Sequence, residues 1–467
     1  MRGALVLLLL TGCRQVFGLD SPEHVDAAPD GFSPRVTGTL ELHVLQNNAA
    51  GLPEVVNTRH DPNSVTLTVT QNGVTSPVDL LPDGSFSFDR TAARYTLLLD
   101  SFSQAGYQLT ADHVILVDRV SGRIDALTPS ANTLLSMSIP GRPSGATEYI
   151  ASSGVFSNTA ITGATTTMSW SSAGFFGAPG LLDAAHFDQL YYLGYMLSGN
   201  TLSLSHFAQA NVTLADGATT LVTLNVAAAA ATFCAKVKEQ FAAEYARVQP
   251  LVRPGYTSST QVSLVRALAS AEMSTGWTLV SQSFSSPADI EQAIAFANPI
   301  PGTTPQLLWT TVFYRSIAGA NVADSASVYM PLDTSTCSAI TTAPVGAVAM
   351  PHSVTLNGID LQDGIVVGVD KTADFAWSTS NERADLYSVT IFSIKNGALA
   401  VVASYFTTDA RLSVDPTLFE PNVTYSLNVS VRTGFPNASM GDFSTNESTR
   451  GLGFMYSPTF TIVRAAP

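Results

Sequence analysis

Residues 418–429 read LFEPNVTYSLNV and join a turn to a β-strand. Pro421 and Asn422 favour the turn, and the residues that follow alternate between apolar and polar. Because successive side chains of a strand point to opposite faces, Tyr425, Leu427 and Val429 share one face. The segment therefore predicts a corner that leads directly into a half-buried strand.

The residues before this corner carry the same kind of pattern. Phe375 to Ser378 predicts a strand with a central tryptophan, Trp377, and Asp385 to Phe392 predicts the next strand. Asn396-Gly397 is typical of the two-residue turn of a β-hairpin. We therefore predict that residues 346–467 form one β-sandwich.

The order of these features along the chain, Trp377, Tyr387 and then the corner at Tyr425, resembles that of a fibronectin type III domain. The resemblance implies that Tyr425 is a tyrosine corner, whose hydroxyl bonds to backbone upstream. It also implies that Trp377 and Tyr387 are the core aromatics of the second and third strands. The chain departs from the family at Arg432 to Met455, where the family has a shorter connection.

That long connection supplies the candidate binding loop, Gly434 to Gly453. Its large side chains stand among Ser, Asn, Thr and Gly, and the candidate binding residues are Phe435, Met440, Phe443 and Arg450. Loops often carry function when a rigid scaffold presents them. Two interpretations stay open: the apolar side chains pack against the sandwich, or they anchor a partner.

Residues 36–140 predict a second sandwich. Strands are expected at Thr37–Val44, Val65–Thr70, Asp83–Phe88, Tyr95–Leu99 and His113–Val117. The segments Val36-Thr37-Gly38-Thr39, Asp83-Gly84-Ser85-Phe86-Ser87-Phe88 and Arg94-Tyr95-Thr96-Leu97 resemble a carboxypeptidase regulatory-like domain. That resemblance implies a transthyretin-like sandwich, although the loop Gln46–Asn63 is longer than the compact loop of the family.

Residues 141–345 predict a β-rich domain with a helical insert. The helix is expected at Ala227 to Val248, because apolar residues recur there every three to four positions, at Phe233, Val237, Phe241, Tyr245 and Val248. Pro250 and Pro254 end it.

The chain begins MRGALVLLLLTGC, and Leu10-Thr11-Gly12-Cys13 resembles the lipobox of bacterial lipoproteins. The resemblance implies a signal peptide at 1–12, lipidation of Cys13 with a palmitate-type acyl anchor in the lipid bilayer, and a tether at 13–35. Arg14 stands where an inner-membrane retention signal would place Asp, which favours the outer membrane of the cell envelope. The alternative is an ordinary secretory signal with an incidental cysteine.

The remaining two cysteines, Cys234 and Cys337, are predicted to form a disulfide, because an exported compartment permits one and their number is even. Two unpaired buried thiols are the alternative.

Composition excludes some functions. Charged residues make up 12% of the 467 residues, the net charge is −14, and the 22 Lys and Arg form no basic cluster, so nucleic-acid binding is not expected. No nucleophile elbow, phosphate loop, dinucleotide fingerprint, CxxC or HExxH motif occurs. We therefore expect no catalytic, cofactor-binding or metal-binding residue.

Two weaker hypotheses concern metal ions. His186 and Asp188 would share one face of a strand and could form half of a metal site. A loose acidic set at the entry of the last domain could bind calcium, and its members are Asp360, Asp363, Asp370 and Asp374. For His186 and Asp188 the favoured interpretation is a surface pair near a turn, and for the acidic set calcium binding is the less favoured interpretation.

The sequence thus predicts a mainly β, multi-domain protein of β-sandwiches with one helix in the middle domain. The predicted function is that of a cell-envelope lipoprotein that acts as a binding, adhesion or scaffolding module on an envelope protein or glycan. The alternative is a hydrolase of envelope polysaccharide or peptide, with its site in residues 141–345.

Overall fold

The computed structural model of the protein describes residues 33–100, 105–152, 155–157, 161, 163–171, 175–176, 180–252, 255–269 and 276–464. Strands dominate these residues, and their α-helix is α2, Phe241–Val248. Helical turns of the 3-10 type occur at Ala184–His186, Pro416–Leu418 and Ala438–Met440. The predicted fold class, mainly β with packed sheets, is confirmed. No helix within the described ranges is long and apolar enough to cross a membrane.

The N-terminal region forms two facing sheets. Its strands are β1 (Arg35–Asn47), β2 (Pro53–Thr58), β3 (Thr66–Gln71), β4 (Val74–Val78), β5 (Ser85–Asp89), β6 (Tyr95–Asp100), β7 (Ala105–Leu109) and β8 (His113–Ser121). β1 pairs with β2, β5 and β8, and the second sheet has the order β4-β3-β6-β7. Leu40, Leu97 and Leu116 lie buried between the sheets because they occupy the inward positions of alternating strands.

The middle region contains most of the strands. They are β9 (Leu134–Ser138), β10 (Thr147–Ser152), β11 (Val155–Ser157), β12 (Thr165–Ser169), β13 (Phe175–Phe176), β14 (Gln189–Ser198), β15 (Thr201–Asn211), β16 (Thr219–Thr223), β17 (Ala227–Ala228), β18 (Phe233–Glu239), β19 (Ser258–Leu268), β20 (Trp277–Phe284), β21 (Ile290–Phe296), β22 (Thr304–Ile317), β23 (Ala320–Pro331) and β24 (Ile340–Thr342). Two small sheets, β12-β9-β16 and β21-β18-β24, accompany a long sheet that runs from β10 to β23.

The predicted helix at Ala227–Val248 is wrong over its first half. Phe233 and Val237 lie on strand β18, which pairs along its whole length with β21. A spacing of four fits both the helical period and the two-residue period of a strand, so these residues could not separate the two structures. Only Phe241–Val248 is helical, and it buries Phe241 and Val248.

The C-terminal region forms a further sandwich. Its strands are β25 (Pro351–Leu356), β26 (Ile359–Asp360), β27 (Ile365–Val369), β28 (Ala373–Thr379), β29 (Leu386–Lys395), β30 (Ala398–Thr407), β31 (Arg411–Val414), β32 (Thr424–Arg432), β33 (Arg450–Tyr456) and β34 (Phe460–Arg464). The sheet β26-β25-β28-β31 faces the sheet that contains β29, β30 and β32.

The predicted corner in this sandwich is present. Tyr425 is buried, and its hydroxyl accepts a hydrogen bond from the backbone N–H of Glu420, at 2.6 Å. Trp377 is buried against Tyr387, with 5.3 Å between ring centroids.

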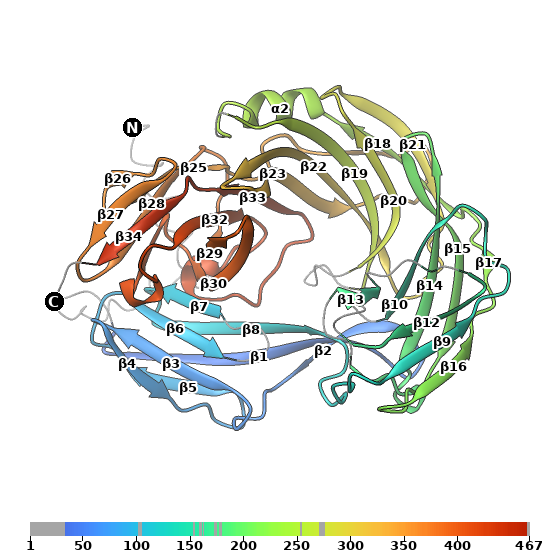
Figure 1. The fold of residues 1–467 in the computed structure, drawn as a ribbon, viewed down its shortest axis with the longest axis horizontal. Coiled ribbons are helices and arrows are strands. Elements are labelled where there is room, and N and C mark those ends of the chain that lie inside the picture. Colours follow the sequence, from blue (N-terminus) through green and yellow to red (C-terminus); the bar gives the residue numbers. More distant parts are fainter. Residues whose placement is uncertain are drawn as a thin grey trace, which may run out of the picture.

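Backbone pairing joins the three regions. Tyr405–Thr407 of β30 pair in parallel with Gly106–Gln108 of β7, and Ser325–Tyr329 of β23 pair with Arg450–Phe454 of β33. One continuous sheet therefore passes through all three regions. In Figure 1 the N-terminal strands, in blue, run along the bottom, the middle region rises on the right, and the C-terminal strands lie between them on the left.

Polar side-chain contacts connect the N-terminal region to the middle region. Arg123 Nε pairs with Asp188 Oδ2 at 2.9 Å, and Asn47 Nδ2 donates to the Phe187 carbonyl, also at 2.9 Å. Each of the three regions thus contacts both of the others. The domain boundaries at residues 36–140, 141–345 and 346–467 stay predictions.

Candidate functional site

The connection between β32 and β33 packs against the N-terminal sandwich. Phe443 is 4% exposed, and its ring lies 5.4 Å from that of Tyr107. Its N–H donates to the Ile115 carbonyl at 3.0 Å, and the Ile115 N–H donates to the Gly441 carbonyl at 2.9 Å. The connection therefore extends the edge of β8 as a short parallel segment.

Gly441 permits this close approach. Its φ is +89°, and a Cβ atom added there would lie 2.3 Å from the backbone oxygen of His113. Only glycine combines this backbone conformation with the absence of a side chain.

The four candidate binding residues do not form one surface. Phe435 is partly buried against the same core as Phe443, whereas Met440 is 65% exposed. Arg450 is the first residue of β33, and its guanidinium lies over the ring of Tyr329, at 5.6 Å. The side chains of Phe435 and Phe443 thus contact their own chain, and Met440 is the member that faces solvent.

The predicted disulfide between Cys234 and Cys337 is present. Cys234 lies on β18 and Cys337 precedes β24, with 5.0 Å between their Cα atoms. The disulfide links β18 to the segment before β24, and these two strands also pair with each other in one small sheet. The predicted lipidation site, Cys13, lies outside the described residues.

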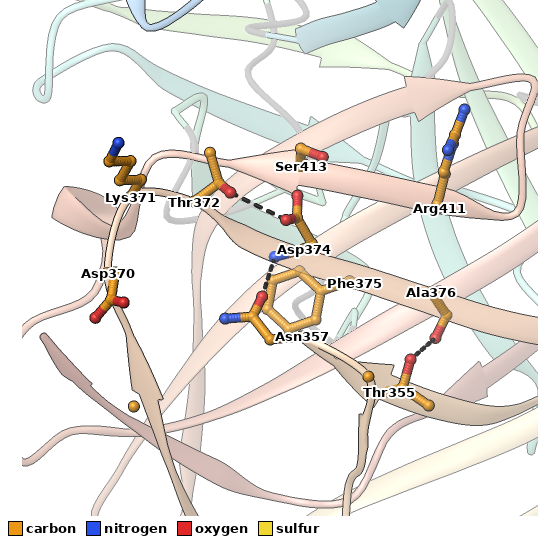
Figure 2. Close-up of a pocket in the computed structure, with 12 residues that line it drawn as sticks. Thr355, Asn357, Asp370, Lys371, Thr372, Asp374, Phe375, Ala376, Arg411 and Ser413 are labelled. Atoms are coloured by element: carbon orange, nitrogen blue, oxygen red, sulfur yellow. Dashed lines mark hydrogen bonds between the residues drawn. The ribbon is translucent and has the colours of Figure 1, made fainter.

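A polar depression lies on the outer face of the sheet β26-β25-β28-β31, and Figure 2 shows its lining. It has a volume of about 800 Å³. Strand alternation explains its composition: Phe375 and Leu412 point into the sandwich core, so their neighbours Asp374, Arg411 and Ser413 face outward.

Hydrogen bonds fix the floor of this depression. The backbone N–H of Asp374 donates to Asn357 Oδ1 at 2.8 Å, and Thr372 Oγ1 donates to Asp374 Oδ2 at 3.0 Å. Lys371 and Arg411 stand on opposite sides of Asp374 in Figure 2, and both are exposed. The face offers fixed acceptors flanked by two exposed cations, of which Arg411 has its Nε 3.8 Å from Asp409 Oδ2. Such a face suits hydroxyl-bearing or charged ligands that bind through hydrogen bonds.

Stacking contributes little to this face, because Phe375, the aromatic residue of the lining, is only 1% exposed.

The four aspartates that the sequence suggested as a calcium site do not all face one site. Asp370 and Asp374 line the depression, whereas Asp360 lines a separate cleft beside His352. Asp363 Oδ1 instead accepts the backbone N–H of Thr459 at 3.0 Å. Within the described residues, no group of three or more His, Cys, Asp or Glu side chains is placed to hold a metal ion.

His186 and Asp188 each interact with a different partner. His186 ends a 3-10 turn, and its Nδ1 lies 2.8 Å from Asp183 Oδ2. Asp188 instead pairs with Arg123. The prediction of a shared strand face is wrong, because a turn stands where the strand was expected.

The middle region has a shallow depression at residues 139–145, beside Ala164. Its charged lining residue is Arg142, which pairs with Glu148 behind it. The lining does not supply the pair of carboxylates that glycoside hydrolysis uses.

Glu239 is a buried carboxylate of the middle region. It is 0% exposed, and neither carboxylate oxygen has a hydrogen-bond partner. Ser263 Oγ and Trp309 Nε1, which belong to directly paired residues of β19 and β22, are likewise buried without partners. Burial raises the pKa of Glu239 to about 7, and the neighbouring Ser263 hydroxyl opposes this shift only partly.

This shift makes stability depend on pH. The carboxyl of Glu239 keeps its proton to about pH 7 in the folded chain but loses it near 4.5 when unfolded. Stability is therefore lost as pH rises from about 4.5 through 7, by roughly 3 kcal/mol at most. Glu239→Gln should remove this dependence and exceed the parent in stability at pH 8, but not at pH 4.5. Urea unfolding of both proteins at the two pH values measures it, and parallel pH profiles would contradict it.

Polar residues that the sequence patterns did not predict as functional join the N-terminal and C-terminal sandwiches. Gln108 Nε2 donates to the Ser413 carbonyl at 2.9 Å, and its Oε1 accepts the Ser413 N–H at 3.1 Å. Arg94 pairs with Asp409 beside it. The sequence did contain one indication of this contact, because Gln108 is the one amide side chain in the apolar segment Ala105–Leu109. This segment forms β7, which is buried along its whole length.

No family model and no curated protein matches this chain. Among solved structures, it is similar to one described as "Structural insight into host cell surface retention of a 1.5-MDa bacterial ice-binding adhesin", at 10% identity and a TM-score of 0.15, covering 92% of this chain and 99% of that chain. A DUF3823 family protein from Bacteroides ovatus matches at 9% identity and a TM-score of 0.12, over 63% of this chain and 97% of that one. E. coli alpha-2-macroglobulin matches at 11% identity and a TM-score of 0.15, over 93% of this chain and 29% of that one. Likenesses at these scores carry no argument about function.

Proposed function

We propose that this protein is a lipid-anchored module of the bacterial cell envelope that binds or scaffolds an envelope protein or glycan without catalysing a reaction. The continuity of the sheet is the observation that carries the proposal. β7 pairs with β30 and β23 pairs with β33, and we infer from this pairing that the three regions move as one body. A rigid body of this kind presents a surface in a fixed orientation, which lowers the entropic cost of binding.

The surface that we propose for binding is the depression of Figure 2. The candidate loop is largely occupied by contacts with the N-terminal sandwich, whereas the depression is open and polar. Asn357 and Thr372 hold Asp374 in place, and the cations Lys371 and Arg411 are exposed beside it.

The test is co-sedimentation of the full chain with isolated outer-membrane and peptidoglycan fractions. Lys371→Glu combined with Arg411→Glu should raise the apparent Kd about tenfold, the effect of losing roughly 1.4 kcal/mol of binding free energy. The matched control is Lys395→Glu, which reverses an exposed cation paired only with the exposed Glu420. Equal binding by all three proteins would overturn this assignment of the surface.

The anchor has its own test. Cys13→Ser should move the protein from the detergent phase to the aqueous phase in detergent phase separation, because the proposed acyl chains supply the membrane affinity. Retention of the variant in the detergent phase would contradict lipidation at Cys13.

A further inference from the structure

The depression of Figure 2 holds its two cations far apart. Lys371 and Arg411 stand on opposite sides of Asp374, and their side chains do not converge. Arg411 pairs across the strands with Ala376, which lies five positions after Lys371. Since a strand rises about 3.3 Å per residue, roughly 15 Å of sheet separates the two cations. A single small anion would therefore contact only one of them, and a ligand that uses both must carry negative groups at intervals.

Hydroxyl-binding groups lie between the two cations. Asp374 of β28 and Ser413 of β31 are direct cross-strand partners, so their side chains are neighbours on the outer face. Thr372 Oγ1 donates one hydrogen bond to Asp374 Oδ2, at 3.0 Å, and the carboxylate keeps lone pairs for further donors. The Ser413 hydroxyl can donate or accept. The centre of the depression therefore suits the hydroxyls of a sugar.

Backbone hydrogen bonds hold both of these residues. Gln108 of β7 accepts the Ser413 N–H at 3.1 Å and donates to the Ser413 carbonyl at 2.9 Å. Asn357 accepts the Asp374 N–H through Oδ1, and its own N–H donates to the Asp374 carbonyl, both at 2.8 Å. The polar groups are thus positioned before a ligand arrives, which lowers the entropic cost of binding.

Two glycines leave one side of the depression open. Gly368 lies on β27, and Gly358 lies in the turn between β25 and β26. A Cβ atom added at either position would meet no heavy atom within 4 Å. A chain-like ligand can therefore continue past this side, so the depression can hold an internal segment of a polymer.

The lining lacks the apolar anchors that hold protein partners. Among the described residues that line the depression, the large apolar side chain is Phe375, which is 1% exposed. Protein interfaces usually centre on aromatic or aliphatic side chains that become buried. Without such a side chain, a neutral glycan would gain hydrogen bonds alone, whereas an acidic glycan also pairs with the two cations.

Asp370 is the acidic neighbour of Lys371 in the connection between β27 and β28, and it is exposed. Its charge opposes a negative group at Lys371, but only weakly, because water screens it. It would instead attract a positive group. The sign of its effect on binding therefore separates an acidic ligand from a basic one.

We propose that this depression binds an acidic polysaccharide. Lys371 and Arg411 pair with negative groups carried on separate sugars, and Asp374 and Ser413 bind the hydroxyls between them. The inference rests on the function proposed above, and it narrows the ligand from an envelope protein or glycan to a polymer of acidic sugars.

Calorimetric titration of the full chain tests the ligand class. Alginate and hyaluronan serve as acidic polysaccharides and dextran as the neutral one, and we expect the parent to bind an acidic polymer but not dextran. Lys371→Gln combined with Arg411→Gln should raise the Kd about tenfold or more, because two charge-assisted contacts are lost. The matched control is Lys395→Gln, which changes an exposed cation paired with Glu420 and should bind as the parent does.

Two further variants test the shape and the charge of the site. Gly368→Leu should weaken binding of the acidic polymer, because the new side chain extends into the open side of the depression. Asp370→Asn should strengthen it, because a repulsion is removed. Both positions are exposed, so the melting temperature should stay at the parent value. Weaker binding by Asp370→Asn would contradict the assignment of an acidic ligand.

The remaining outcomes separate this inference from the proposed function. Failure of both acidic polysaccharides, or equal binding of dextran, would overturn the inference. Polyglutamate that binds as tightly as alginate would show that the site takes an acidic polypeptide, which also overturns it. Envelope fractions whose binding still depends on Lys371 and Arg411 would then leave the proposed function standing. Binding of an acidic polysaccharide without binding to envelope fractions would contradict the proposed function alone.

Discussion

Truncation of Phe443 to alanine is expected to lower the free energy of unfolding by about 3–5 kcal/mol, the usual cost of removing a buried aromatic ring. The ring fills space in the core of the N-terminal sandwich, although the residue belongs to a connection of the C-terminal sandwich. Its loss therefore weakens both the core and the junction. Urea unfolding followed by tryptophan fluorescence measures the change.

Met440 supplies the matched control for this experiment. It stands in the same connection and is 65% exposed, so Met440→Ala should change stability by no more than about 0.5 kcal/mol. If Phe443→Ala leaves stability unchanged and instead abolishes binding to envelope fractions, the connection is an anchor for a partner and our interpretation of its packing is wrong.

Removal of the disulfide should have an effect of similar size. Cys234 and Cys337 are 103 residues apart, and chain-entropy arguments give about 4–5 kcal/mol for a loop of this length, a value that depends on the model used. The double variant Cys234→Ser with Cys337→Ser should lose this stability, and reduction of the parent protein should reproduce the loss. A peptide map without reduction in which both thiols can be alkylated would contradict the bond itself.

The local features of the C-terminal sandwich could be predicted because their causes are local. The turn at Pro421 and Asn422 and the alternation after it place Tyr425 inside, where its hydroxyl meets the Glu420 backbone. The predicted helix at residues 227–248 failed because its local pattern was ambiguous and a long-range contact decided between the two structures. Its apolar spacing of four fits a strand, and the pairing of β18 with β21 decided the outcome.

The junctions between regions could not be predicted from the sequence. Gly106 pairs with Tyr405, and a Cβ atom at Gly106 would lie 2.5 Å from the Tyr405 ring, so this junction requires glycine. A lone glycine in the sequence, however, does not indicate which distant residue packs against it. The hydrogen bond from Arg119 to the Phe443 carbonyl depends on that pairing and on the docking of Phe443. Side chains that meet only through long-range pairing share no sequence motif. The sequence could therefore locate the candidate binding loop, but it could not show that the loop packs against the N-terminal sandwich.

Hydrogen exchange at the two junctions tests directly whether the three regions form one rigid body. We predict that the amides of residues 105–109 and 405–407, and those of 325–329 and 451–454, exchange as slowly as the core strand β29. Exchange at either junction that is many-fold faster than in β29 would show that the regions separate in solution, and the account of a rigid binding module would be contradicted.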